Sequence, residues 1–125
     1  MKFDWSEYLG LAQELAGQTV SPASQEAKLR AAISRAYYAA FCRARNHLRD
    51  NEGYVIPLGG EAHTFVRDQF KNSPDRLRSQ IGHNLDRLRR HRNMVDYDDS
   101  VTGLLPMTSR DLRLAQRVLS ALTIL

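Results

Sequence analysis

Residues 29–48 have the sequence LRAAISRAYYAAFCRARNHL, and their apolar positions follow the 3.6-residue repeat of an α-helix. The apolar stripe consists of Leu29, Ile33, Ala36, Tyr37, Ala40, Phe41, Ala44 and Leu48. A helix that carries such a stripe buries it against neighbouring helices. The stretch therefore predicts a long helix with one face in the core.

Caps, glycines and prolines divide the rest of the chain into further helices. Asp4 and Glu7 predict a capping box for a helix that runs to about Ala16. Ser21-Pro22 and Ser73-Pro74 each predict a cap followed by proline at the first helical position. The long helix then ends near Asn51, before Gly53.

A third helix is expected over about residues 61–71, and a fourth ends at Val95 or Tyr97. Thr108 with Asp111 predicts the cap of a fifth helix. Since short loops join these helices, we predict an all-α fold: an up-and-down antiparallel bundle of about five helices. Residues 1–125 form one domain in this prediction.

Composition narrows the class of protein. The 42% apolar and 26% charged residues are ordinary for a soluble domain, and no apolar run approaches the ~18 residues that span a bilayer. The N-terminus lacks a signal-peptide core, so we expect a cytoplasmic protein with no membrane part. Cys42 is the single cysteine and is predicted to be a packed thiol. No metal-ligand spacing occurs, so neither a metal nor a cofactor is expected.

Arginine dominates the positive charge. The net charge is +4, but 15 arginines stand against 3 lysines. Guanidinium groups suit bidentate contacts with phosphate or carboxylate. The bias predicts phosphate recognition or an arginine-rich interface, unless it reflects only the base composition of the genome.

The expected fourth helix carries a cation on its apolar face. Leu77, Ile81, Leu85, Leu88 and Val95 fall near one meridian, and Arg92 lies among them. A buried cation needs a partner, so Arg92 either pairs with Asp96 one turn on or forms part of a site.

A basic run ends in Arg92 and includes Arg87, Arg89, Arg90 and His91. These arginines are candidates for binding RNA phosphates. Asp96, Asp98 and Asp99 follow directly, so a self-paired helix end is the alternative.

A second face of the long helix combines an aromatic ring, small side chains and arginines. It consists of Arg30, Ser34, Tyr38, Cys42, Arg45 and Arg49. Successive helical residues diverge by about 100°, so Tyr37 is expected in the core and Tyr38 on this face. The face predicts a dimer contact or a groove wall, with a solvated surface as the alternative.

Two segments resemble a known family. Residues 34–41, which are Ser34, Arg35, Ala36, Tyr37, Tyr38, Ala39, Ala40 and Phe41, look like the S-R-x-Y-Y-A-x-F signature of HEPN domains. Arg92 to Tyr97 is similar to the R-x-x-A-D-Y helix end of one branch, in which many members carry a histidine near His63. The resemblance covers about residues 5–100. It implies a prokaryotic helical bundle that dimerises through its second and fourth helices and is often encoded beside a nucleotidyltransferase.

Catalytic HEPN proteins are metal-independent ribonucleases, with arginine, a polar residue and then a histidine at the end of the fourth helix. Arg92 and Asn93 match the start of this motif, but Tyr97 and two aspartates stand where the histidine is expected. A carboxylate is a weak base near pH 7 and repels phosphate. Weak or absent ribonuclease activity is therefore expected. His91 is a candidate replacement. Arg78 with His83 also matches the spacing, but 15 arginines and 4 histidines favour chance matches, and the pair lies more than two turns from the family position.

Three hypotheses follow. The first is a HEPN-like homodimer of a toxin-antitoxin or defence system, which acts with a nucleotidyltransferase or another effector and binds RNA or a nucleotide. The second is an active metal-independent endoribonuclease of the same fold. The third is a structural dimerisation module. Besides Arg92, the motif and interface candidates are Ser34, Arg35, Tyr37, Tyr38, Phe41, Arg45, Asp96 and Tyr97.

Overall fold

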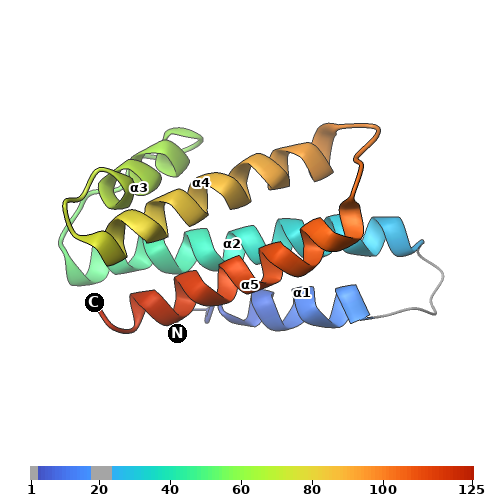
Figure 1. Cartoon of the computed structure of the whole chain (residues 1–125). Coiled ribbons are helices and arrows are strands. Elements are labelled where there is room, and N and C mark those ends of the chain that lie inside the picture. Colours follow the sequence, from blue (N-terminus) through green and yellow to red (C-terminus); the bar gives the residue numbers. More distant parts are fainter. Residues whose placement is uncertain (1–2, 18–23) are drawn as a thin grey trace.

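The computed structural model describes residues 3–17 and 24–125, and this part of the chain is helical without strands (Figure 1). The helices are α1 (Glu7–Gly17), α2 (Gln25–Asn51), α3 (Glu61–Lys71), α4 (Arg76–Tyr97) and α5 (Leu104–Leu122). Along the chain, α1, α2, α4 and α5 alternate in direction (Figure 1). The predicted all-α bundle is confirmed. No helix in the described ranges is both long enough and apolar enough to cross a membrane.

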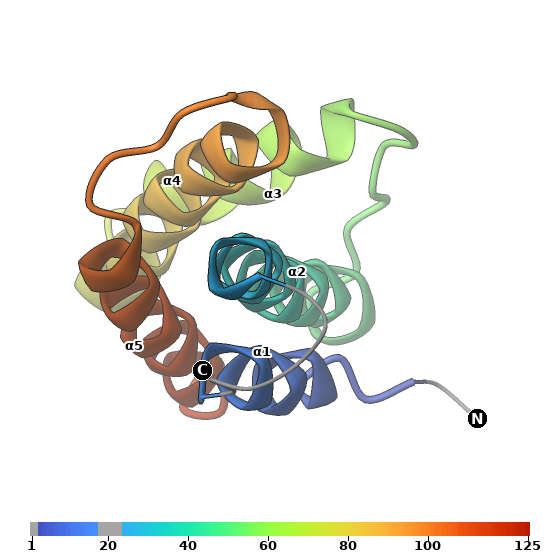
Figure 2. The same cartoon turned by 90° about the vertical axis from the view of Figure 1, so that its right-hand side faces the viewer.

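The central element is α2, which packs against the four other helices. Figure 2 looks along α2 and shows α1, α5 and α4 arranged around it. Every residue of the predicted stripe is buried, and so are Ala32, Ala39 and Cys42. Because many of these side chains are alanine, the neighbouring helices approach the α2 backbone closely.

The bundle does not close around α2. In the described part of the chain, α1 has no contact with α3 or α4, although all three pack against α2. One face of α2 therefore stays uncovered between α1 and α3, on the right-hand side of Figure 2.

The start of α1 differs slightly from the prediction. The helix begins at Glu7, and a turn precedes it in which the Asp4 carboxylate accepts hydrogen bonds from the Ser6 amide (3.0 Å) and hydroxyl (2.6 Å). Asp4 thus acts as a cap, as expected, but for a turn that leads into the helix. The rings of Phe3 and Tyr8 pack together across this helix start, with centroids 5.5 Å apart.

The helices α2 and α4 are not capped by the serine-proline pairs that the sequence predicted. Ser21-Pro22 lies outside the described residues, and α2 is capped by Ser24, whose hydroxyl accepts from the Ala27 amide at 3.1 Å. In α4 the cap is Asp75 rather than Ser73. The Asp75 carboxylate accepts from the Arg78 amide at 2.9 Å, so the helix starts two residues after Pro74.

The predicted cap of α5 was wrong. The helix begins five residues earlier, after Gly103, whose φ of 67° favours glycine. Pro106 lies in the first turn of the helix. Amides there have no intrahelical acceptor, so the lack of an amide proton on proline removes no hydrogen bond. The Thr108 hydroxyl donates to the Leu104 carbonyl at 2.8 Å, and Asp111 is fully buried instead of capping a helix end.

The C-terminal end of α4 is tied to α2 by Arg30. Its guanidinium donates to the carbonyl oxygens of Val95 (2.8 Å), Asp98 (2.7 Å) and Asp99 (3.1 Å). These carbonyls lie at a helix end, where intrahelical donors are lacking. Arg30 thus fixes the position of the last turn of α4, which directly follows Arg92.

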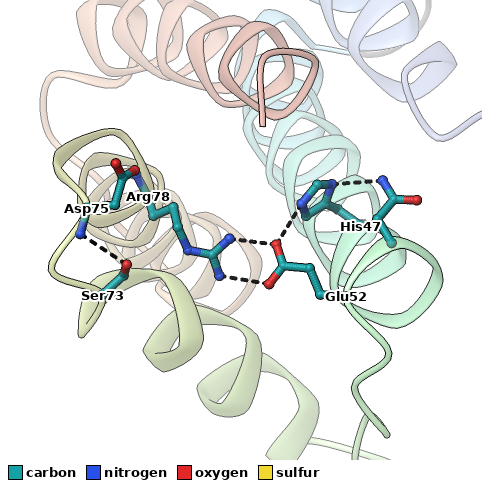
Figure 3. Close-up of polar contacts among 6 residues, drawn as sticks. His47, Glu52, Ser73, Asp75 and Arg78 are labelled. Carbon is teal, nitrogen blue, oxygen red and sulfur yellow. Dashed lines mark hydrogen bonds and ion pairs between the residues drawn. The ribbon is translucent and has the colours of Figure 1, made fainter.

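A polar network joins the C-terminal end of α2 to the N-terminal end of α4 (Figure 3). Arg78 donates to both oxygens of Glu52, at 2.5 and 3.1 Å, and His47 contacts Glu52 at 2.8 Å. The hydrogen bond from Arg78 holds the pKa of the Glu52 carboxyl below its ordinary value. Arg78 therefore has a structural partner, while His83 is exposed on α4.

A close backbone approach between α3 and α4 generates the first prediction. A Cβ atom on Gly82 would lie 2.2 Å from the Lys71 backbone nitrogen, whereas one on Gly10 in α1 would meet nothing within 4 Å. We expect Gly82→Ala to lower the free energy of unfolding by about 1–3 kcal/mol, because the helices must separate. Gly10→Ala, the matched control, should raise it by about 0.5–1 kcal/mol. Urea unfolding of both variants tests this, and an unchanged or more stable Gly82→Ala protein would contradict the close contact.

Candidate functional site

Three helices bring five side chains together, and we call this group the His63 cluster. It consists of Tyr37 and Tyr38 from α2, His63 from α3, and Arg89 and Arg92 from α4. The Tyr37 hydroxyl is hydrogen-bonded to Nδ1 of His63. The Arg92 guanidinium lies 5.4 Å from the ring centroids of both tyrosines.

Burial of Tyr37 positions His63. The Tyr37 side chain lies in the core, and its hydroxyl needs a polar partner there. Burial raises the pKa of Tyr37, so the phenol stays protonated. The His63 ring also stacks on Phe41, with centroids 4.2 Å apart. Tyr38 is half-buried on the second face, as predicted.

His63 is electrically neutral at pH 7. Burial, followed by the charges of Arg89 and Arg92, lowers its pKa from 6.5 to about 4. In the tautomer in which Tyr37 donates to Nδ1, Nε2 carries the proton and is a hydrogen-bond donor. The cluster therefore combines two guanidinium cations with an uncharged imidazole.

Arg92 is buried mainly against aromatic rings. Its side chain is 11% exposed, and its nearest carboxylate oxygen, on Asp96, is 3.9 Å away. Asp96 also accepts from the Ser34 hydroxyl at 3.2 Å, and its side chain is 31% exposed. The predicted ion pair is thus present, but it is long, and its carboxylate is not buried.

Both arginines of the cluster keep unused donors. The Nε atoms of Arg89 and Arg92 are buried and have no hydrogen-bond partner within the described ranges. The one side-chain hydrogen bond that Arg89 donates there goes to the Thr64 hydroxyl, at 3.3 Å. Both cations thus have unused hydrogen-bond donors, and the nearest carboxylate is distant. These features favour binding of an anion.

The other members of the predicted basic run lie elsewhere on α4. Arg87 is exposed, and Arg90 is an exposed partner of Asp86 at 3.5 Å. Asn93 and Tyr97 are also exposed, Tyr97 to 75%. Of the four arginines proposed to bind phosphate, Arg89 and Arg92 reach the cluster.

His91 faces α5 and not the cluster. Its Nδ1 lies 2.9 Å from both carboxylate oxygens of Asp111, whose side chain is 0% exposed. Burial raises the pKa of Asp111, although the hydrogen bond with His91 opposes this. The pair ties α4 to α5, so the structure gives the candidate His91 a packing contact away from Arg92.

An open groove of about 1000 Å³ lies along the uncovered face of α2, and we call it the α2 groove. Trp5 and Tyr8 form one side, and the segment 54–59 with Ala62 and His63 forms the other. The floor comes from α2 and contains Arg35, Tyr38, Phe41, Cys42, Arg45 and Arg49. Tyr38 and His63 belong to both the groove and the His63 cluster, so the two are continuous.

The lining of the α2 groove is aromatic and cationic. Among the described residues, the lining contains three arginines and no aspartate or glutamate. The Arg35 guanidinium lies over Tyr8 (5.1 Å) and Tyr38 (5.5 Å), and that of Arg45 lies over Trp5 (5.6 Å).

The predicted second face of the long helix divides in the structure. Tyr38, Cys42, Arg45 and Arg49 line the groove, whereas Ser34 and Arg30 bind the end of α4. Cys42 is buried, and burial raises the pKa of its thiol, as expected of a packed cysteine.

His63 was not predicted as a site residue from its surroundings in the sequence. The position of a histidine in the family that the chain resembles was the available signal. No sequence signal marked Trp5 and Tyr8 as groove residues, because their contact with α2 depends on tertiary packing. No group of metal-ligating side chains occurs among the residues that the structure describes.

Comparison with known proteins gives little functional information. No family model matches the chain, and no solved structure matches it. The chain is similar to an uncharacterized protein of Methanocaldococcus jannaschii, with 29% identity over 114 residues. The match covers 80% of this chain and 63% of that protein, so the chain spans less than two thirds of its relative's length.

The lowered pKa of His63 predicts how stability depends on pH. Between pH 6.5 and about 4 the unfolded chain binds a proton at this residue that the folded chain excludes, so acidification favours unfolding. We expect the free energy of unfolding to fall less from pH 7 to pH 4.5 in His63→Gln than in the wild type. His83→Gln, an exposed histidine on α4, is the control and should behave as the wild type does. Urea unfolding at both pH values measures the difference, and equal losses in all three proteins would contradict the assignment.

Proposed function

We propose that the protein is a HEPN-like RNA-binding protein that holds an RNA phosphate at the His63 cluster and cleaves RNA weakly or not at all. The supporting observation is the convergence of Arg89 and Arg92, with unused buried donors, on a neutral histidine and two tyrosines. The biological setting that we propose, a toxin-antitoxin or defence system, rests on the family resemblance.

Phosphate fits the electrostatics of the cluster. The positive charges of its two guanidinium groups lower the pKa of His63. The nearest carboxylate, that of Asp96, is 3.9 Å from Arg92. The Nε2 proton of His63 adds a neutral donor. RNA fits better than a small inorganic anion because tyrosine rings and the aromatic groove adjoin the charges, and unpaired bases stack on such surfaces.

Weak cleavage follows from the proton chemistry. General acid–base catalysis at neutral pH works best with a pKa near 7, whereas that of His63 is about 4. Its conjugate acid is scarce at pH 7, and one ring nitrogen is engaged by Tyr37. Tyr97, near the family position of the histidine, is exposed and lies outside the cluster.

One observation favours the second hypothesis, an active metal-independent endoribonuclease. His63 is a histidine beside Arg92, which is the pairing that the resemblance implies for catalysis, although it comes from another helix. If the protein cuts RNA, His63 is therefore a better candidate than His91.

RNA binding should depend on Arg92. We expect Arg92→Gln to weaken binding of a labelled single-stranded RNA and to reduce the slope of log affinity against log salt by about 1, because one phosphate contact is lost. Fluorescence anisotropy at several salt concentrations measures both quantities. Arg113→Gln, an exposed arginine on α5, makes the same charge change away from the cluster and is the control.

Arg89→Gln is the second variant, in case Arg92→Gln does not fold, and circular dichroism monitors the fold of each. Equal losses in Arg113→Gln and the cluster variants would contradict the site. Absence of RNA binding by the wild type would favour the third hypothesis, a structural dimerisation module.

Cleavage is tested separately with long single-stranded RNA in EDTA. We expect no robust cutting by the purified protein. Cutting that disappears in both Arg92→Gln and His63→Gln would establish the endoribonuclease and displace our proposal. Dependence on His91→Ala instead would identify His91 as the catalytic histidine.

We also propose that the protein is a homodimer that acts with a nucleotidyltransferase or another effector. The resemblance implies dimerisation through α2 and α4, and two-fold contacts would present each patch twice. Light scattering at tens of micromolar should give twice the chain mass of 14.3 kDa. A monomeric mass at that concentration would remove this part of the proposal.

A further inference from the structure

We propose that the α2 groove is a base-binding subsite, which takes an unpaired base of single-stranded RNA and its adjoining phosphate. The inference rests on the proposed function and deepens it, because it names where the RNA lies beyond the His63 cluster. It is carried by the groove's size, its uncompensated arginines, its exposed apolar rim and its continuity with the cluster.

The groove is large for the cluster alone. Its volume of about 1000 Å³ lies at the upper end of the ~300–1000 Å³ that small-molecule sites occupy. A cavity of this size accommodates a nucleotide with part of the next one. Its opening between α1 and α3 leaves the ends of a longer chain free.

Two arginines of the groove have no ion pair among the residues that the structure describes. Arg35 and Arg45 have no carboxylate partner in the described part of the chain, whereas Arg49 pairs with Asp50 at 2.8 Å. Arg35 and Arg45 instead lie over aromatic rings, which hold their guanidinium planes at the groove surface. Guanidinium planes and aromatic rings are surfaces on which RNA bases stack, and the positive charge attracts phosphate.

The rim of the groove exposes apolar side chains. Val55 is 89% exposed and Leu58 is 94% exposed, and both line the groove. The flat faces of a base would cover such side chains, which a free phosphate ion would leave in water. The chemistry of the groove therefore fits a base joined to a phosphate better than an isolated anion.

Tyr38 and His63 give the path between the two parts of the site. Both line the groove, while Tyr38 also lies under Arg92 and His63 is bonded to Tyr37. A phosphate held by Arg92 would therefore have its neighbouring nucleotide at the groove. This order places successive units of one RNA strand along the uncovered face of α2.

The single tryptophan makes the groove observable. Trp5 lines it and lies beside Arg45, so a base that stacks there should quench Trp5 fluorescence. Anisotropy of a labelled RNA reports all binding, whereas Trp5 reports occupancy of the groove. The probes are a single-stranded RNA oligonucleotide, the same sequence as a duplex, and adenosine 5′-monophosphate.

We expect the single-stranded RNA to bind and quench Trp5, and the duplex to bind more weakly without quenching. Arg45→Gln and Leu58→Asp should each weaken binding of the single strand by about five- to tenfold and reduce the quenching. Arg113→Gln and Leu105→Asp make the same changes at exposed positions of α5 and should leave binding unchanged. Since Leu58 is 94% exposed, its substitution is compatible with folding.

Each other outcome has a distinct meaning. RNA binding that depends on Arg92 but neither quenches Trp5 nor responds to the groove variants would overturn the subsite and leave the proposed function intact. Absence of RNA binding would overturn both. Adenosine monophosphate that binds as tightly as RNA, with the same quenching, would support the base-phosphate chemistry but replace RNA with a free nucleotide. A blue shift of Trp5 emission with protein concentration alone would assign the groove to a second copy and overturn the proposal.

Discussion

The hydrogen bond between Tyr37 and His63 joins the core of the bundle to its candidate site. Because Tyr37 is buried at the middle of α2, its hydroxyl requires a partner, and α3 provides one. The same ring supports the Arg92 guanidinium from α4. The geometry of the candidate site is therefore fixed by side chains that also pack the core. Substitution of Tyr37 would therefore disturb the fold and the cluster together.

The sequence predicted the helices better than their first residues. The apolar stripe of α2 and the end of this helix at Asn51 needed no tertiary information, because periodicity and composition determine them. The starts of α4 and α5 were misplaced because several residues near each start are competent caps. Thr108 and Asp111 have cap-forming side chains, but their partners, Leu104 and His91, come from the preceding turn and from another helix.

The candidate site was predictable where a residue broke a pattern. Arg92 was identified because a cation interrupts an apolar meridian, and the structure places it among aromatic rings. His63 interrupts no comparable pattern, and its lowered pKa results from burial and from charges on α4. The α2 face that forms the floor of the groove was predicted to be a dimer contact, a groove wall or a solvated surface. Its two sides come from other segments, and the groove is open because α1 and α3 do not meet. Such a gap is a property of packing between distant segments.

The attachment of Arg30 to the end of α4 affects the electric field around Arg92. A helix presents the negative end of its dipole at its C-terminus, and three aspartates follow Arg92 within seven residues. An incoming polyanion would meet that negative potential at close range. The Arg30 charge lies against the carbonyls of Val95, Asp98 and Asp99, where it offsets the dipole locally. Arg30, which lies outside the His63 cluster, thereby makes the potential around the end of α4 less negative.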